Sequence, residues 1–367
     1  MSELAELLSR LVAIDSVNPD LIPGAAGEGE VAAFVARWLE RAGLDVEFEE
    51  VAPGRPNVVG TARGTGAGRT LLLNAHTDTV GVAGMEAPHA PRIDGDRLYG
   101  RGAYDMKAGL AAAMLAGAEA ATRGLAGDVV VAAVCDEEVA GSGTQRLVAT
   151  RRADAAIVTE PTELAVAVAH KGFAGFEIEV TGRAAHGSRP DLGVDAIAAM
   201  GPVLVELAAL DRRLREAPTH RLLGSGSLHA SLIEGGQEFS SYPERCLLTG
   251  ERRTVPGETA EGVERELRDV LARAGSEASL RMQVARGPFE VAEDEPIVEI
   301  VRRHAAAEIV GVPFWADSAT LAAAGIPTVL YGPGGEGAHA AVEWVSLADA
   351  ERCREVLVAT CADFCSL

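Results

Sequence analysis

The sequence of 367 residues is short of basic charge and has no long apolar run. It carries 33 lysines and arginines against 54 aspartates and glutamates, a formal net charge of −21. This excess of negative charge repels nucleic acid and anionic membranes, so neither is an expected partner. No 18-residue apolar stretch and no charged-then-apolar leader with a cleavage site is present, so neither a membrane span nor a secretory signal is predicted.

Cysteine is scarce and lacks the spacing of a zinc ribbon or a disulfide framework. The five residues of this type are Cys135, Cys246, Cys353, Cys361 and Cys365. An odd, unpatterned set of this kind favours a reducing cytoplasm. The Gly-x-Ser-x-Gly sequence of serine hydrolases is missing, and no Gly-Lys-Ser/Thr follows the glycine-rich stretch 64–68. That stretch is therefore predicted to be a hairpin turn between two strands.

Apolar runs typical of buried strands alternate with helical patterns at both ends of the chain. The expected strands include 57–61, 71–73, 128–134, 155–158 and 328–331. The expected helices include 30–42, 106–123, 297–310, 318–324 and one from 346. The outer pieces 1–172 and 286–367 are predicted to form one catalytic α/β domain, with a mixed sheet and helices on both faces.

The middle of the chain has a different texture. Phe176, Ile178 and Val180 alternate with polar residues, as in a strand with one wet face. Helical patterns at 194–215 and 258–273, with further strand signals, complete a β-α-β-β-α-β order. Residues 173–285 are therefore predicted to be an inserted α+β domain, an antiparallel sheet with helices on one side.

Polar residues follow the ends of several predicted strands. His76, the pair Glu137 and Glu138, Glu160 and His339 each come shortly after a separate apolar run. Ligands of open α/β sheets gather in the crevice at the carboxyl ends of the strands, so one crevice can collect all five side chains.

Asp105 lies between a glycine-rich turn and an apolar helix. A carboxylate has two oxygens and can bridge two cations about 3.5–4 Å apart. The competing interpretation is an aspartate that only caps the following helix.

These residues together form a nitrogen and oxygen donor set that suits zinc, with cobalt or manganese as alternatives. Two divalent cations would also relieve the repulsion among clustered carboxylates. In an extended segment Glu137 and Glu138 would point to opposite sides, so one is expected to bind metal and the other to handle protons. Asp78, two positions after His76, is expected to orient the imidazole.

Seven motifs occur in order along nearly the whole chain. They are Ala75-His-Thr-Asp78, Gly100-Arg-Gly-Ala-Tyr-Asp-Met-Lys107, Asp136-Glu-Glu138, Thr159-Glu-Pro161, Ala185-His-Gly-Ser188, Gly332-Pro-Gly334 and Ala338-His-Ala340. The combination resembles the M20 family of dinuclear zinc hydrolases. That family includes acetylornithine deacetylases, succinyl-diaminopimelate desuccinylases, aminoacylases and carboxypeptidases.

The resemblance implies a zinc-peptidase-like catalytic domain in which His76, Asp105 and Glu160 bind one zinc. Asp105, Glu138 and His339 would bind the other, and Glu137 would be the general base. The resemblance also implies that the insert is a lid through which two copies form a homodimer.

Further roles in the insert and the last loop follow from the same resemblance. His186 would reach the partner's site, and Arg253 would grip a substrate carboxylate unless it only forms a surface salt bridge. Ser240 stands where family members often carry asparagine. The backbone amides of Gly332, Gly334 and Gly335 could contact the substrate carboxylate, or belong to a plain loop.

The expected activity is hydrolysis of the amide bond of an N-acyl amino acid by metal-activated water. A dipeptidase or carboxypeptidase acting on short peptides with the same chemistry is the alternative. A non-catalytic metal- or peptide-binding protein would have lost the base or a ligand, and none is missing here.

Overall fold

The computed structural model describes residues 2–366, which fold into two compact units. The first unit contains the chain up to Val168, Val291–Val310 and the chain from Ala316 onward. The second contains Ala169–Glu290 and Gly311–Trp315, and so extends a few residues beyond each edge of the expected insert. Within residues 2–366, no helix has the length and apolar character needed to cross a membrane.

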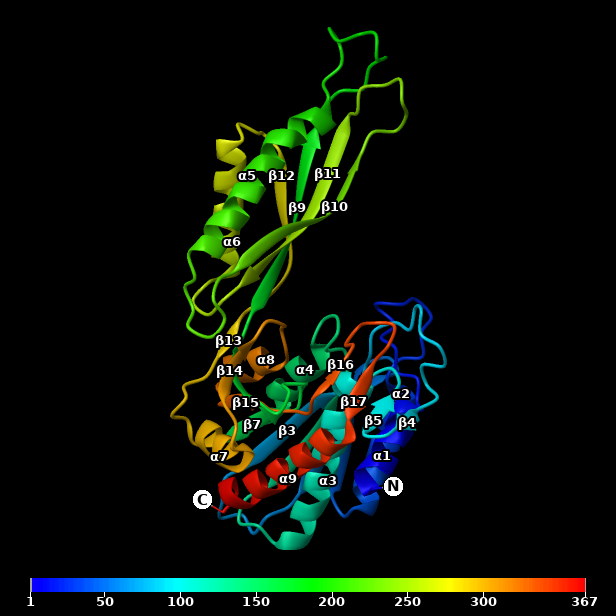
Figure 1. Ribbon diagram of the computed structural model, residues 1–367, viewed down its shortest axis with the longest axis vertical. Helices are drawn as coiled ribbons and strands as arrows, with labels where there is room; N and C mark the ends of the chain where they lie inside the picture. Colours follow the sequence, from blue (N-terminus) through cyan, green and yellow to red (C-terminus); the bar gives the residue numbers. More distant parts are fainter. Residues whose placement is uncertain (1, 367) are drawn as a thin grey trace. The chain divides into compact units, whose positions relative to one another are not determined.

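The first unit alternates helices and strands along its chain segments (Figure 1). Its helices are α1 (Glu3–Val12), α2 (Gly29–Arg41), α3 (Ala108–Arg123), α4 (Ser142–Thr150), α7 (Pro296–Ala305), α8 (Ser318–Ala323) and α9 (Leu347–Phe364). Its main-sheet strands are β1 (Asp45–Ala52), β2 (Arg55–Ala62), β3 (Leu71–His76), β6 (Val129–Val134), β7 (Ala155–Val158), β8 (Val166–His170), β14 (Ile309–Val312) and β15 (Thr328–Leu330). A small separate sheet is formed by β4 (Arg92–Asp94), β5 (Arg97–Tyr99), β16 (Gly335–Glu336) and β17 (Trp344–Ser346).

The strand order of the main sheet is β1-β2-β6-β3-β7-β15-β8-β13, where β13 is the short strand Phe289–Glu290, and β14 pairs with β8. The four consecutive strands β6, β3, β7 and β15 run parallel, and β2 and β8 are antiparallel to their neighbours. The sheet is therefore mixed, as predicted. The carboxyl ends of the four parallel strands meet at one edge, which is where the candidate ligands follow them.

Helices cover both faces of this sheet. Gly60 on β2 faces α2, where an added Cβ would meet the Leu39 side chain at 2.9 Å. Asn57 lies an odd number of residues away on the same strand, so it faces the other side, where its amide donates to the Gly143 carbonyl of α4. The predicted fold class is confirmed.

Two local predictions are wrong. The stretch 64–68 joins β2 to β3, but β6 lies between them, so it is no hairpin turn. Every residue of β6 is buried, and this apolar strand pairs with both neighbours. The helix expected at 297–310 ends at Ala305, because Ala306 adopts the left-handed conformation (φ 53°) and β14 follows.

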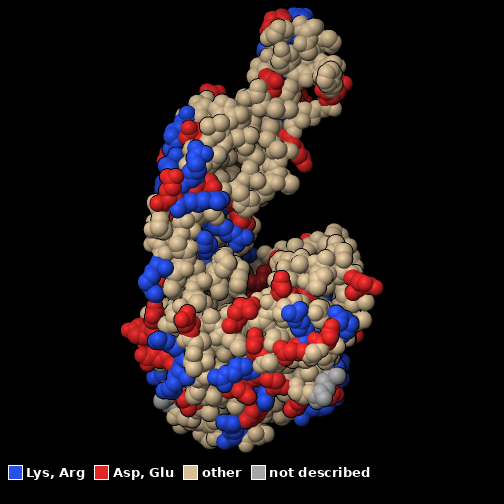
Figure 2. All heavy atoms as spheres, in the orientation of Figure 1, with Lys and Arg blue, Asp and Glu red and all other residues tan. Residues whose placement is uncertain are grey.

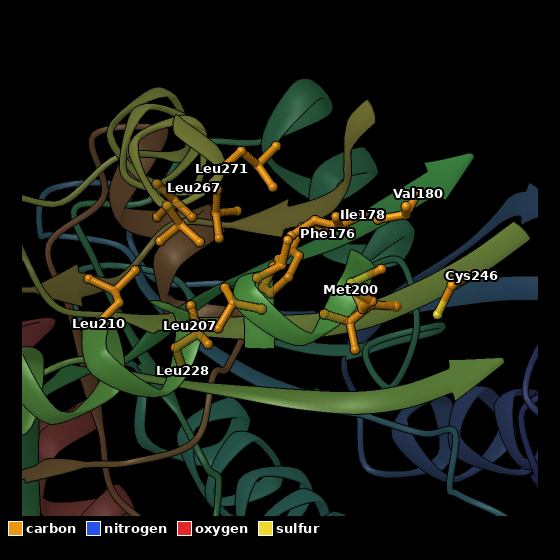
Figure 3. Close-up of a cluster of buried hydrophobic side chains, with 14 of the residues drawn as sticks. Phe176, Ile178, Val180, Met200, Leu207, Leu210, Leu228, Cys246, Leu267 and Leu271 are labelled. Atoms are coloured by element: carbon orange, nitrogen blue, oxygen red, sulfur yellow. The ribbon is translucent and has the colours of Figure 1, made fainter. Parts of the chain in front are cut away.

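The second unit is an antiparallel sheet with two helices. Its elements are β9 (Gly172–Thr181), α5 (Ala196–Glu216), β10 (Ser227–Gly235), β11 (Arg245–Thr254), α6 (Ala260–Arg273) and β12 (Ser279–Arg286). The strand order is β10-β11-β9-β12. The inward residues of β9, among them Phe176 and Ile178, pack with Leu207 of α5 and Leu267 of α6 (Figure 3).

Surface charges of both signs are interspersed over the first unit (Figure 2). On the second unit, the outward glutamates of β9 lie opposite arginines. Glu179 accepts from Arg245 on β11 at 2.8 Å, and Glu177 pairs with Arg281 on β12. The period-2 prediction for this strand is confirmed, with cross-strand ion pairs on the wet face.

Candidate metal centre and active site

Three strand ends supply most of the candidate ligands. His76 is the last residue of β3 and is 2% exposed, and Glu160 follows β7 and is 4% exposed. Glu137 and Glu138 follow β6 in a turn. Because β6, β3 and β7 are adjacent and parallel, these side chains meet at one edge of the sheet.

Asp105 comes from a segment that is pressed against the same edge. It lies in the irregular turn η1 (Ala103–Lys107), and its torsions (φ −114°, ψ 96°) are not helical. The helix α3 begins only at Ala108 and has Lys107 at its N-cap, so the helix-cap interpretation of Asp105 is wrong. In α3, Gly109 lies so close to β7 that an added Cβ would come within 2.0 Å of the Thr159 carbonyl oxygen. This close approach brings the start of α3 beside Glu160.

Two histidine and carboxylate sets share Asp105. His76 Nε2 lies 3.1 Å from Asp105 Oδ1 and 3.6 Å from Glu160 Oε1. His339 Nε2 lies 3.4 Å from Asp105 Oδ2 and 3.2 Å from Glu138 Oε2. Each oxygen of Asp105 therefore faces a different imidazole.

These distances test whether the residues fit metal ions. With bonds of about 2.1 Å and tetrahedral geometry, two ligand atoms on one zinc lie about 3.4 Å apart. The four distances, from 3.1 to 3.6 Å, bracket that value. Two candidate metal-binding groups also emerge from ligand-atom spacing alone, His76 with Asp105 and Glu138, and His76 with Glu137 and Glu160. The donor set is therefore of a kind and spacing that fits divalent cations, with Asp105 between the two imidazoles.

The electrostatics of the cluster show how much negative charge it holds. Burial raises the pKa of Glu137 and of Glu160 well above the ordinary value. Burial alone would lower the pKa of His76, but Glu160 and the hydrogen bond to Asp105 raise it well above the ordinary value. Hydrogen bonds to Asp105 and Glu138 raise the pKa of His339 to about 10. The cluster therefore concentrates negative charge, which favours bound protons or cations.

A pH dependence of the metal-free protein follows. The raised pKa values of Glu137, Glu160 and His339 mean that these three groups bind more protons in the folded state than in the unfolded chain, so their contribution to stability should fall as pH rises. The contribution of His339 is complete below 6.5 and disappears as pH rises through about 10. The melting temperature of chelator-treated protein should decrease across this pH interval. In His339→Gln, the melting temperature should change less with pH in the upper part of the interval. A melting temperature that increases from pH 6.5 to 10 would contradict this reading.

Comparison with known proteins identifies the fold and the chemistry. The profile of Peptidase family M20/M25/M40 matches residues 72–363. The chain belongs to this family.

Relatives of the M20 chain cover it almost completely. It is 32% identical to the acetylornithine deacetylase of Myxococcus xanthus, over 99% of this chain and 97% of that protein. It is 30% identical to the acetylornithine deacetylase of Vibrio cholerae, over 90% and 89%. Membership in the M20 family confirms the resemblance inferred from the motifs, and it makes the protein a metallohydrolase of the peptidase and deacetylase group.

Solved structures share the M20 fold at lower identity. An M20 family metallo-carboxypeptidase from Sulfolobus solfataricus superposes with a TM-score of 0.81, covering 100% of both chains at 18% identity. A dinuclear metal-binding peptidase of the family from Bacillus subtilis gives a TM-score of 0.71, covering 98% of both chains at 18% identity. At this identity the likeness shows the fold alone.

Glu137 and Glu138 of this M20 chain lie in a turn. The expectation that their side chains point to opposite sides assumed an extended segment, which the structure does not have here. Asp136, just before the pair, adopts a left-handed conformation (φ 66°). Glu138 contacts His339, and Glu137 groups with His76 and Glu160. The two side chains thus face different parts of one cluster because the backbone turns between strand and loop.

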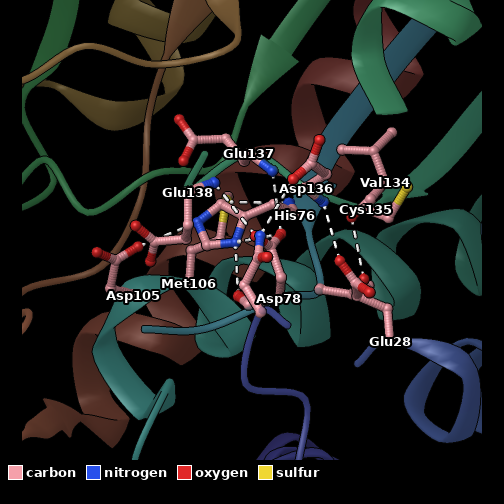
Figure 4. A network of polar contacts seen from close by, with 12 residues as sticks. Glu28, His76, Asp78, Asp105, Met106, Val134, Cys135, Asp136, Glu137 and Glu138 are labelled. Atoms are coloured by element: carbon pink, nitrogen blue, oxygen red, sulfur yellow. Dashed lines mark hydrogen bonds and ion pairs between the residues drawn. The ribbon is translucent and has the colours of Figure 1, made fainter. Parts of the chain in front are cut away.

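Asp78 acts on the backbone of this turn (Figure 4). Its carboxylate accepts from the amides of Glu137 at 3.1 Å and Glu138 at 3.2 Å. The imidazole of His76 instead has its Nδ1 2.9 Å from the backbone carbonyl of Asp78, with the carboxylate 3.6 Å away. Asp78 therefore holds the imidazole by its main chain and the glutamate turn by its side chain.

Several buried polar residues at the site were not found by sequence reasoning. Asn18 donates to Asp78 at 2.8 Å and to Asp136 at 3.2 Å. Thr144 donates to Asp317 at 2.6 Å. Burial is the main cause of the raised pKa of Glu137, and the negative charge of Asp317 contributes in the same direction. Asn18 and Thr144 lie among other polar residues without a recognisable motif, so only their burial in the fold singles them out.

The remaining candidate residues lie in the second unit or in the last loop. His186 is exposed, with Nδ1 2.8 Å from Ser188 Oγ. Arg253 pairs with Glu251 at 2.6 Å and stacks over Phe173 at 5.3 Å. The carbonyl of the exposed Ser240 accepts from the Gly187 amide at 2.7 Å.

The glycine amides of the last loop already have acceptors within the protein. Gly332 donates to Thr162 Oγ1 at 3.0 Å, and Gly335 is 3.4 Å from Glu163 Oε1. The backbone of Gly334 hydrogen-bonds to the carboxylate of Asp349. A substrate carboxylate at these amides would have to displace these partners, two of which are negatively charged.

Proposed function

We propose that this M20 chain hydrolyses the amide bond of an N-acyl amino acid with two bound divalent cations. The observation that carries the proposal is the pair of histidine and carboxylate sets that share Asp105, with Glu137 beside them. His76, Asp105 and Glu160 would hold one cation, and Asp105, Glu138 and His339 the other. Zinc suits this donor set best, and cobalt or manganese fits the same oxygen and nitrogen ligands.

The chemistry divides between the cations and Glu137. When bound, the cations would polarise the substrate carbonyl and lower the pKa of water toward neutrality. Glu137 takes a proton from the attacking water while the water oxygen bonds to the carbonyl carbon. It returns the proton to the nitrogen as the C–N bond breaks, giving a carboxylate and an amine. Glu137 is placed for this role because its carboxylate groups with His76 and Glu160 at the edge of the sheet.

The second unit supports a homodimer. In the register of β11 and β9, Arg253 lies opposite Phe173, near one end of β9. Thr181 is at the other end of β9, and His186 follows it along the chain. Eight residues of strand span roughly 26 Å at about 3.3 Å per residue. Arg253 and His186 of one copy therefore cannot both reach one small substrate. We propose that Arg253 grips the substrate carboxylate and that His186 helps polarise the carbonyl in the partner's site.

The edge strand β10 offers a surface for this association. Leu232 and Ile233 are 65% and 52% exposed and point to opposite faces of β10. On the neighbouring helix α5, Val205 is 65% exposed. Exposed apolar side chains on an edge strand favour association with another chain, here a second copy. A fully active monomer would remove the proposed role of His186.

The relatives, which are named acetylornithine deacetylases, support this substrate class. Purified protein loaded with zinc, cobalt or manganese should release amine from acetylated or succinylated amino acids faster than from dipeptides. Faster cleavage of dipeptides would instead assign a peptidase. A metal-loaded protein inert on every amide would overturn the proposal.

The five free and buried cysteines support a reducing, cytoplasmic location.

A further inference from the structure

The two halves of the metal cluster are held with unequal firmness. His76 ends a strand of the main sheet, is almost fully buried, and has its second ring nitrogen on a backbone carbonyl. His339 lies in a loop with left-handed backbone (φ 61°), and its side chain is 55% exposed. Something other than local packing must fix His339 relative to Asp105.

Glu343 is placed to do this. The pairing of Trp344 on β17 with Tyr99 on β5 brings Glu343 beside the segment that leads to Asp105 (Figure 1). Glu343 Oε1 accepts from the amides of Tyr104 at 2.9 Å and Asp105 at 3.1 Å. Its Oε2 accepts from the Gly102 amide at 3.0 Å. One buried carboxylate thus holds three amides of the Asp105 turn.

Arg101 extends the same contact to the His339 loop. Its Nη1 donates to Glu343 Oε2 at 2.7 Å, and its Nη2 donates to the carbonyl of Ala340, next to His339, at 3.0 Å. Its Nε donates to the Gly81 carbonyl at 3.2 Å. The Glu343 and Arg101 side chains are 0% and 2% exposed. A single ion pair therefore ties the backbone of Asp105 to the backbone beside His339.

Stability alone is a weak reason for such a pair. Removing two charges from water costs free energy that their attraction often fails to recover, and apolar replacements of buried ion pairs are frequently neutral or stabilising. The geometry here gives the pair a different use, because three of its hydrogen bonds end on the turn that carries a bridging carboxylate. Partners of this kind, which orient ligands from behind, commonly set metal affinity.

We propose that Glu343, acting through Arg101 and the amides of the Asp105 turn, is a positioning residue that sets the affinity of the cation on the His339 side. The proposal rests on the dinuclear function proposed above. The His76 side depends less on the pair, because the sheet and Asp78 hold that histidine independently. Loss of the pair should therefore weaken one of the two cation sites selectively.

Metal binding by the full-length protein tests this without any assay of hydrolysis. Equilibrium dialysis of the chelator-treated protein against zinc or cobalt alone should give two bound cations for the wild type. Glu343→Gln replaces an acceptor oxygen by an NH2 group, which faces the donors of the turn. We expect one site to weaken about 10- to 100-fold and the other to change less than about threefold. Arg101→Lys keeps the charge but loses the fork, and should weaken the same site.

The control is Val301→Ala, a buried position on α7, outside the segments that carry the site residues. It should lower the melting temperature and leave both cation affinities unchanged. Unchanged affinities in both Glu343→Gln and Arg101→Lys, or equal weakening of both sites, would overturn the proposal. So would a comparable loss of affinity in Val301→Ala. A wild type that binds two cations but hydrolyses no amide would overturn the proposed function and leave the positioning role intact.

Discussion

Replacing Glu137 by glutamine should lower the rate of amide hydrolysis by about 100- to 10,000-fold, the usual contribution of a positioned general base. Glutamine has nearly the same shape but cannot accept the proton of the attacking water. The number of bound cations should stay the same, because the proposed ligand sets use Glu138 and Glu160. Turnover of an acylated amino acid and metal content, measured on the same preparation, check this.

The metal measurement matters because ligand spacing alone also groups Glu137 with His76 and Glu160. If Glu137→Gln loses a cation, Glu137 is a ligand and the assignment of the base is wrong. Asp128→Asn is a matched control at the opposite end of β6. Asp128 directly precedes β6, and its carboxylate accepts from the Gly64 amide at 2.8 Å. Its replacement should leave turnover and metal content unchanged.

Replacing Asp105 by asparagine should reduce the binding of both cations and lower hydrolysis at least as much as Glu137→Gln. The amide side chain has one acceptor oxygen and no charge, so it cannot bridge two cations as a carboxylate does. Water activation then fails together with cation binding. Equilibrium dialysis should show fewer bound cations at both sites, and added zinc should restore little activity.

A variant of Asp105 that keeps one cation at wild-type affinity would show that the two sets are independent. The comparison with Glu343→Gln is informative, because that change should weaken a single site. The Asp128→Asn control serves here as well, since it removes one carboxylate charge far from the ligand cluster.

Much of the site was predictable because strand ends are visible in sequence. His76, Glu138 and Glu160 follow apolar runs that the structure shows as three adjacent parallel strands. Parallel strands place their carboxyl ends together, so three proposed ligands come together by a topological rule rather than by specific contacts. The alternation of apolar and polar residues also predicted β9 as a strand with one solvent-facing side, because such a strand gives a period-2 signal.

Other features were not predictable because they depend on which strands are neighbours. The glycine-rich stretch 64–68 has the composition of a hairpin turn, yet β6 pairs between the strands that it joins. Asp105 has the sequence position of a helix cap, but Gly109 lets α3 approach β7, and the preceding turn departs from helical geometry. Local propensity describes neither case, because the deciding contacts come from distant segments.

The sequence by itself determined the family, the mixed α/β class and the residue types of the proposed ligands, because these depend on residue order and apolar periodicity. Only the tertiary structure decided how the ligands are held. Asn18 and Glu343 are ordinary polar residues in the sequence, and their importance follows from burial beside backbone amides that lie far from them along the chain. Hydrogen bonds between distant segments form only in the folded protein, and here they set the positions of Asp105, the glutamate turn and His339.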